Sequence, residues 1–222
     1  MNLILCEGSG EIAFIYSYLK TKGYNIKFKK SELYKLSRNK KYMENEIVDN
    51  LFLLDIEGNG NLEKIVKKIL KSPLEERELI EKVGIFIDAE KDFSETYNRA
   101  KKVSEDIKGQ LGVEVYLYIS PYNNKCDGML ENLIMGISKD KDLLSFIEEK
   151  SFPELSYKVE EQGEKIKNPT KAKFMIYGAT QNPMNGVAYL FLTEDDTIEK
   201  LDFDSEKMEN FKKFMNQLVK KM

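Results

Sequence analysis

Residues 84–92 read GIFIDAEKD, an apolar run followed by three alternating acids, Asp88, Glu90 and Asp92. A short apolar run of this kind is typical of a strand that is buried on both faces of a sheet. The same pattern occurs at residues 3–11, LILCEGSGE, where Glu7 follows the apolar residues. We therefore predict two buried strands, each of which ends at a carboxylate.

Two further apolar runs, at residues 51–56 and 113–120, predict strands of the same sheet. Apolar residues at helical spacing separate these runs, which indicates a helix between each pair of strands. This alternation favours an α/β fold of Rossmann-like type, with a mostly parallel sheet and helices on both faces. We expect residues 1–125 to form the α/β core. Residues 126–222 are expected to form a mainly helical C-terminal extension, packed on the core within the same domain.

The composition restricts the chemistry that the acids can perform. The chain of 222 residues contains no histidine, which excludes Ser-His-Asp and Cys-His nucleophiles and histidine-bound zinc. The carboxyl ends of parallel strands lie at one edge of a sheet, so Glu7, Asp88 and Glu90 are expected to face one crevice. Carboxylate oxygens are typical ligands of hard cations, and we predict a divalent-metal site for Mg²⁺ or Mn²⁺.

Two features near these acids have alternative explanations. Asp92 is either a further metal ligand or the N-cap of the helix that follows it. The Gly8-Ser9-Gly10 segment either permits a tight turn or brings backbone amides close to a bound phosphate.

A basic segment at residues 20–41 contains nine Lys or Arg residues and one acid. Its candidate nucleic-acid-binding residues are Lys27, Lys29, Lys30 and Arg38. Such a segment can follow a phosphate backbone, or it can be a solvated surface that balances acids elsewhere. The sequence has no apolar run of about 20 residues and no signal-peptide pattern, so we expect a cytoplasmic protein without a membrane partner.

In chain order, the motifs resemble the Toprim domain of topoisomerases, primases and related nucleases. The closer resemblance is to OLD-type (overcoming lysogenisation defect) nucleases and small Toprim-like proteins. The matching residues are Glu7, Gly8 and Glu11; Asp88, Glu90 and Asp92; Leu130 and Glu131; and Lys171 and Ala172. Glu90 departs from the family pattern, in which Asp is commoner at this position.

The resemblance implies a role for each of these polar residues. Asp88 and Glu90 would be the principal metal ligands, and Glu7 a ligand or general acid/base. Glu11 and Glu131 would complete a second metal position, and Lys171 would neutralise charge that develops on a phosphate. From the residues alone, Glu131 is equally explained as a helix-surface acid and Lys171 as a solvated lysine.

These observations predict a nuclease or phosphoryl-transfer enzyme that acts on nucleic acid, working as a Mg²⁺- or Mn²⁺-dependent phosphodiester hydrolase. Two alternatives remain open. One is a catalytically inactive Toprim-like module that binds a nucleotide or nucleic acid, which the Glu90 departure favours. The other is a protein-interaction scaffold that binds no metal.

Overall fold

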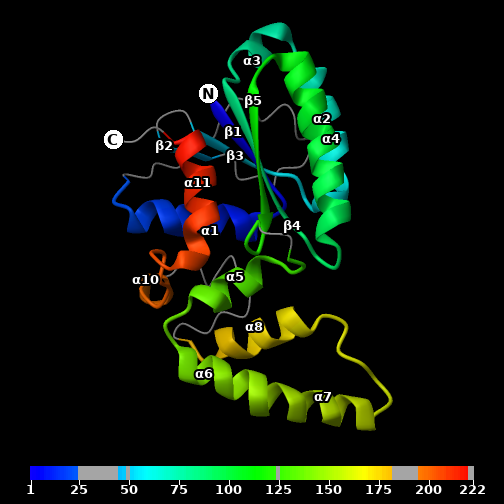
Figure 1. Ribbon diagram of the computed structural model, residues 1–222, viewed down its shortest axis with the longest axis vertical. Helices are drawn as coiled ribbons and strands as arrows, with labels where there is room; N and C mark the ends of the chain where they lie inside the picture. The colour runs from blue at the N-terminus through cyan, green and yellow to red at the C-terminus, as the bar shows by residue number, and fades with distance from the viewer. Residues whose placement is uncertain (25–44, 49–50, 124–125, 182–194, 220–222) are drawn as a thin grey trace.

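The structure is a computed structural model that describes residues 1–24, 45–48, 51–123, 126–181 and 195–219 (Figure 1). Its centre is a five-stranded sheet in the order β2-β3-β1-β4-β5. The strands are β1 (Asn2–Cys6), β2 (Asn45–Val48), β3 (Leu51–Asp55), β4 (Lys82–Asp88) and β5 (Glu114–Ser120). Four of them run parallel, and β2 pairs antiparallel with β3 at one edge. The predicted mostly parallel α/β sheet is confirmed.

The strands are buried on both faces, as their continuous apolar character predicts. In β1, Leu3 and Leu5 belong to one core cluster, whereas Ile4 and Cys6 belong to the other. Successive side chains of a strand point to opposite faces, so one strand serves two cores. Each core therefore requires its own layer of helices.

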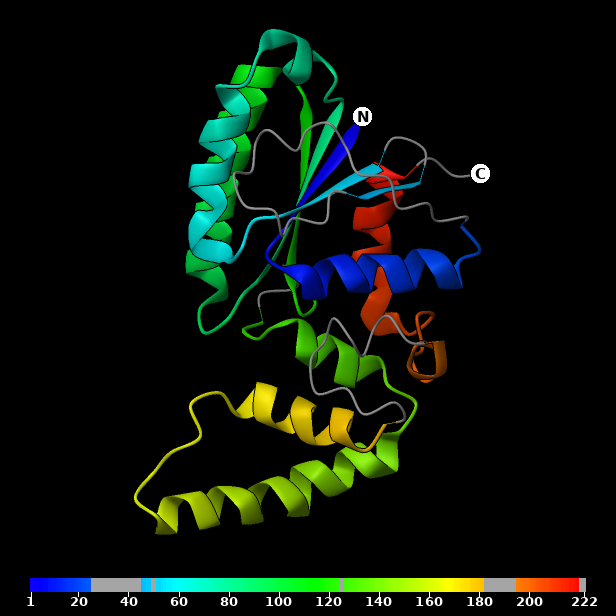
Figure 2. The ribbon, with the colours of Figure 1, turned by 180° about the vertical axis from the view of Figure 1, so that it is seen from behind.

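Helices α2 and α4 cover one face of the sheet, and α1, α5 and α11 pack in the core on the other face (Figures 1 and 2). The first layer is extended by the short η2 and α3. The bounds on this side are η2 (Asn59–Asn61), α2 (Leu62–Leu70), α3 (Leu74–Glu78) and α4 (Phe93–Leu111). The bounds on the other side are α1 (Ser9–Thr21), α5 (Leu130–Ile137), α10 (Asp195–Ile198), η4 (Glu206–Met208) and α11 (Glu209–Leu218).

Residues 141–179 form a helical arm that extends away from the sheet beyond α5 (Figure 2). The arm consists of α6 (Lys141–Phe146), a π-helical turn η3 (Ile147–Ser151), α7 (Phe152–Glu161) and α8 (Pro169–Ala179). Its inner helix α8 buries Phe174 and Tyr177, whereas α7 has no buried residue. The predicted helical C-terminal extension is confirmed. Among the described residues, no helix has the length and apolar character needed to cross a membrane.

Candidate functional site

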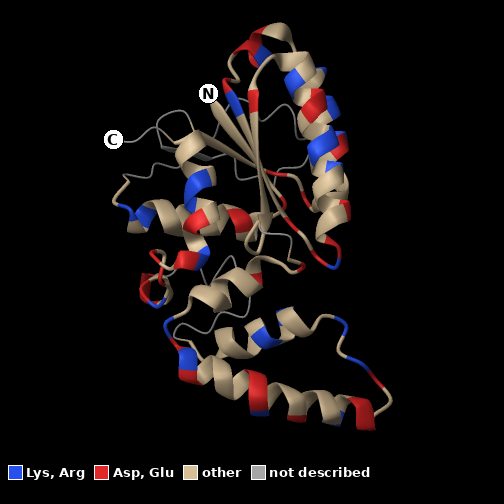
Figure 3. Ribbon diagram, viewed as in Figure 1, with Lys and Arg blue, Asp and Glu red and all other residues tan. Residues whose placement is uncertain are grey.

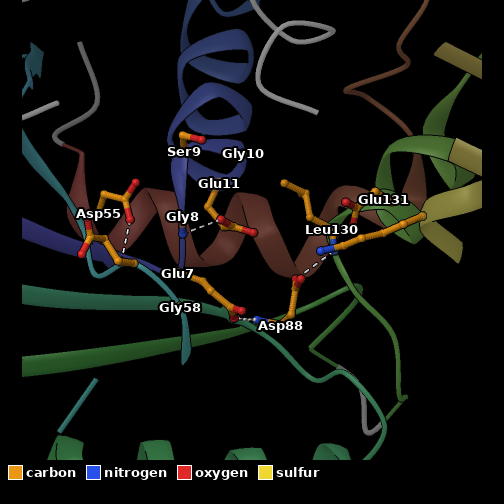
Figure 4. Close-up of a pocket in the computed structure, with 12 residues that line it drawn as sticks. Glu7, Gly8, Ser9, Gly10, Glu11, Asp55, Gly58, Asp88, Leu130 and Glu131 are labelled. Atoms are coloured by element: carbon orange, nitrogen blue, oxygen red, sulfur yellow. Dashed lines mark hydrogen bonds between the residues drawn. The ribbon is translucent and has the colours of Figure 1, made fainter. Parts of the chain in front are cut away.

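Three neighbouring strands deliver a carboxylate to the same edge of the sheet. Asp55 ends β3 and Asp88 ends β4, while Glu7 directly follows β1. These acids border a pocket of about 400 Å³ (Figure 4). The pocket is lined by Glu7, Gly8, Ser9, Gly10, Glu11, Asp55, Glu57, Gly58, Asp88, Leu130, Glu131 and Lys171.

Glu7 and Asp88 are held by backbone amides. The Asp88 N–H donates to Glu7 Oε2 at 2.9 Å, and the Leu130 N–H donates to Asp88 Oδ1 at 2.8 Å. Figure 4 shows both bonds, which connect β1, β4 and the start of α5. Each carboxylate keeps oxygen lone pairs that these bonds do not use, so both can accept a further ligand.

Glu11 lies in the first turn of α1 and is buried, with 6% of its surface exposed. Its Oε2 accepts the Gly8 N–H at 2.8 Å, which closes the first turn of the helix. The Gly8 amide is therefore already occupied by a carboxylate. Ser9 and Gly10 also border the pocket, and the phosphate-binding role of all three residues stays a prediction.

The buried carboxylates of this site resist ionisation. Burial, followed by repulsion from Glu7, raises the pKa of Glu11 to about 8. Burial and then repulsion from Glu11 raise the pKa of Asp88 well above its usual range. Burial, and to a smaller extent repulsion from Glu90, raises the pKa of Glu7, although the Asp88 amide and the charge of Lys171 oppose the change. A cation or protons would relieve this repulsion.

The wall opposite the strands comes from the chain after residue 125. Glu131 lies in the first turn of α5, next to the amide that binds Asp88. Lys171 lies in the first turn of α8, where its N–H donates to Oδ1 of the N-cap Asn168 at 2.9 Å. The structure thus brings both residues to the pocket that contains Glu7 and Asp88.

Asp55 and Glu57 line the pocket but were not among the predicted site residues. Asp55 Oδ1 accepts the Glu57 N–H at 2.7 Å, and the Gly58 N–H donates to the Glu7 carbonyl at 2.7 Å. The loop after β3 is therefore attached to the loop after β1. Asp55 ends a buried apolar run just as Asp88 does, so the rule that identified Asp88 also applies to it.

Glu90 and Asp92 do not line the pocket, and both are exposed. The prediction that alternating acids share one side requires an extended segment, but Glu90 has a left-handed φ of 54°. Its backbone instead pairs with Gly128, with N···O distances of 2.6 and 2.8 Å. Asp92 Oδ1 accepts the Glu95 N–H at 2.9 Å, which confirms the helix-capping alternative for this residue.

The four basic residues assigned to nucleic-acid binding lie outside the described residues. They belong to residues 25–44 and are Lys27, Lys29, Lys30 and Arg38. Their role stays a prediction.

The chemistry of the pocket fits a hard divalent cation, because its acidic groups offer oxygen ligands and repel one another. The positions of these acidic side chains do not form a complete ligand set for one ion. Across the described parts of the chain, no three acidic, cysteine or histidine side chains are gathered into a group that could hold an ion. Glu7, Glu11 and Asp88 each accept a backbone N–H, so a complete ligand set would require acidic side chains of the pocket to change rotamer.

Comparison with known proteins assigns the chain to a family without assigning an activity. The family model described as "Protein of unknown function (DUF3226)" matches residues 1–220. The chain has no significant match among curated proteins or among solved structures.

Proposed function

For this member of the DUF3226 family, we propose a Toprim-like enzyme that uses Mg²⁺ or Mn²⁺ to hydrolyse or transfer phosphodiester bonds in nucleic acid. One observation carries the proposal: Glu7, Glu11, Asp88 and Glu131 line one pocket at the carboxyl edge of a parallel sheet, with Lys171 on the same pocket. An open α/β sheet binds ligands at this edge.

Each residue of the pocket has a chemical task in this proposal. Glu7, Asp88 and Glu131 would hold the cation, with Glu11 as a further ligand. The bound metal would lower the pKa of a water molecule and stabilise charge on the phosphate. Lys171 would attract the same phosphate. Its positive charge lowers the pKa of Glu7, which indicates that this charge acts within the pocket. In hydrolysis, the oxygen of water forms a bond to phosphorus, the bond from phosphorus to the departing oxygen breaks, and the proton that the water loses is balanced by one taken up by the departing oxygen.

A catalytically inactive binding module is the second candidate, and the position of Glu90 favours it. The resemblance makes Glu90 a principal ligand, yet its side chain is exposed and does not line the pocket. A site that lacks this ligand could retain a metal and a nucleotide without turnover.

The first test compares cleavage by the wild-type protein and by Asp88→Asn. Labelled single- and double-stranded DNA and RNA are incubated with EDTA, Mg²⁺ or Mn²⁺, and products are separated on denaturing gels. Asparagine keeps an oxygen that can accept the Leu130 N–H but removes the charge, so the fold should survive. We expect metal-dependent product from the wild type and at least about 100-fold less from Asp88→Asn.

Asp92→Asn is the matched control, because the same chemical change falls outside the pocket and asparagine is also a good N-cap. It should retain wild-type cleavage. Equal product from Asp88→Asn would contradict the proposal. Absence of any product, together with calorimetric Mn²⁺ binding that Asp88→Asn loses, would favour the binding module.

A further inference from the structure

The loop before α8 and α8 itself, in the helical arm, carry a net positive charge. Residues 165–181 contain four lysines and no acid. Lys173 forms an ion pair with Glu148 at 2.6 Å. Lys165, Lys167 and Lys171 are exposed. Within the part of the chain that the structure describes, neither Lys165 nor Lys167 has an ion-pair partner.

One of these three lysines borders the pocket, and the other two precede it along the chain. Lys171 borders the pocket, and Lys165 and Lys167 lie in the loop that leads to α8. The residue between them, Ile166, is partly buried, whereas both lysines are exposed. Lys165 lies six positions before Lys171 in the chain, so the two residues are at most about 20 Å apart along the backbone.

The acids of the arm lie on α6, η3, α7 and the loop after α7. Figure 3 shows acidic segments along α7 and basic segments along the loop and α8. The acids at the far end are Glu160, Glu161 and Glu164. The loop and α8 are therefore more favourable for an anionic ligand than α7, where one acid, Glu161, is paired with Lys158 at 2.8 Å.

We propose that Lys165, Lys167 and Lys171 bind consecutive phosphates of one nucleic-acid strand whose reactive phosphodiester lies in the pocket. This inference rests on the proposed function, because the acidic pocket defines where the strand is processed. A mononucleotide in the pocket would not need Lys165 and Lys167, which are not among the lining residues. The ligand class is thus a polynucleotide with phosphates on one side of the reactive bond.

The test measures binding of a labelled 12-nucleotide single-stranded DNA by fluorescence anisotropy, with Ca²⁺ in place of Mg²⁺. The double variant Lys165→Gln/Lys167→Gln should bind roughly tenfold more weakly at about 0.1 M salt. Its plot of log affinity against log salt should be less steep by about 1.4, because each lost phosphate contact contributes about 0.7. Binding of thymidine monophosphate should be unchanged.

Lys101→Gln/Lys102→Gln on α4 makes the same charge change on another part of the surface and should bind like the wild type. Equal affinity and salt dependence in the arm variant would overturn the proposal. So would displacement of the DNA by a polyglutamate peptide as readily as by unlabelled DNA, which would indicate an acidic protein partner.

The two proposals fail in different ways. If the wild type binds DNA through the arm but never cleaves it, phosphate binding by the three lysines is supported and the enzymatic function is wrong. If the wild type cleaves with Mn²⁺ and the arm variant cleaves the 12-nucleotide DNA with the same KM, the enzymatic function is supported. Phosphate binding by the arm lysines is then wrong.

Discussion

Glu11 illustrates how the position of one carboxyl group controls the ionisation of the site. Its pKa is about 8 in the folded protein, against an ordinary value of 4.5, because the side chain is buried and faces Glu7. The folded state therefore holds this proton more tightly than the unfolded chain does. The resulting stability is fully present below pH 4.5 and is lost as the pH rises toward 8.

We predict that the free energy of unfolding of the metal-free protein falls by roughly 2–5 kcal/mol between pH 5 and pH 8.5. Glu11→Gln should show a smaller fall, because glutamine does not ionise and can still accept the Gly8 N–H. The fall that remains comes from Asp88 and Glu7, whose pKa values burial also raises. Urea unfolding in EDTA at the two pH values measures the difference. Glu105→Gln on the exposed side of α4 is the control. Equal pH dependence in Glu11→Gln and the wild type would contradict the raised pKa of Glu11.

At the scale of elements, β4 and α11 approach each other at Gly84. A Cβ atom there would lie 2.6 Å from Leu218 Cδ1 and 2.9 Å from Phe214 Cζ, both in side chains that are buried. Gly84→Ala requires these two buried side chains of α11 to shift, and we predict a loss of about 1–3 kcal/mol in the free energy of unfolding.

Gly109→Ala is the matched substitution for this test. Gly109 lies in α4, where an added Cβ would meet no atom within 4 Å. Alanine should therefore stabilise the helix by about 0.5–1 kcal/mol. Urea unfolding of both variants should give changes of opposite sign. A change of the same sign in both would show that α11 does not pack this closely on β4.

Most of the elements around the site follow from apolar pattern alone. The apolar run that precedes Asp88 predicts a strand and forms part of Lys82–Asp88, because a fully buried parallel strand needs apolar residues on both faces. The exposed position of Glu90 could not be predicted in this way, since it depends on a backbone φ of 54° and on pairing with Gly128. Short-range pattern contains no information about such a long-range backbone pair.

At the scale of the whole molecule, the C-terminal part of the chain has two roles: the arm contributes to the pocket, and α11 packs in the core beside the sheet. The arm reaches the pocket through Lys171, whereas α11 returns to the sheet. Asn2 Nδ2 donates to the Leu218 carbonyl at 2.5 Å, so the first strand is attached to the last helix. The resemblance to Toprim proteins implied that Glu131 and Lys171 join the site, and both line the pocket. The return of α11 depends on aromatic contacts between distant segments, which no local pattern reveals.

Phe211 on α11 tests whether this return makes the chain one cooperative unit. Its ring is fully buried, and its centroid lies 5.0 Å from that of Phe14 on α1 and 5.2 Å from that of Tyr118 on β5. We predict that Phe211→Ala lowers the free energy of unfolding by about 3–5 kcal/mol. Phe146→Ala removes a ring that is 54% exposed on α6 and should cost less than about 1 kcal/mol.

Urea unfolding followed by far-UV circular dichroism and by tyrosine fluorescence should show one shared transition, displaced in Phe211→Ala. Two separate transitions, or an unchanged midpoint in Phe211→Ala, would mean that α11 is not part of the core on which the pocket is built.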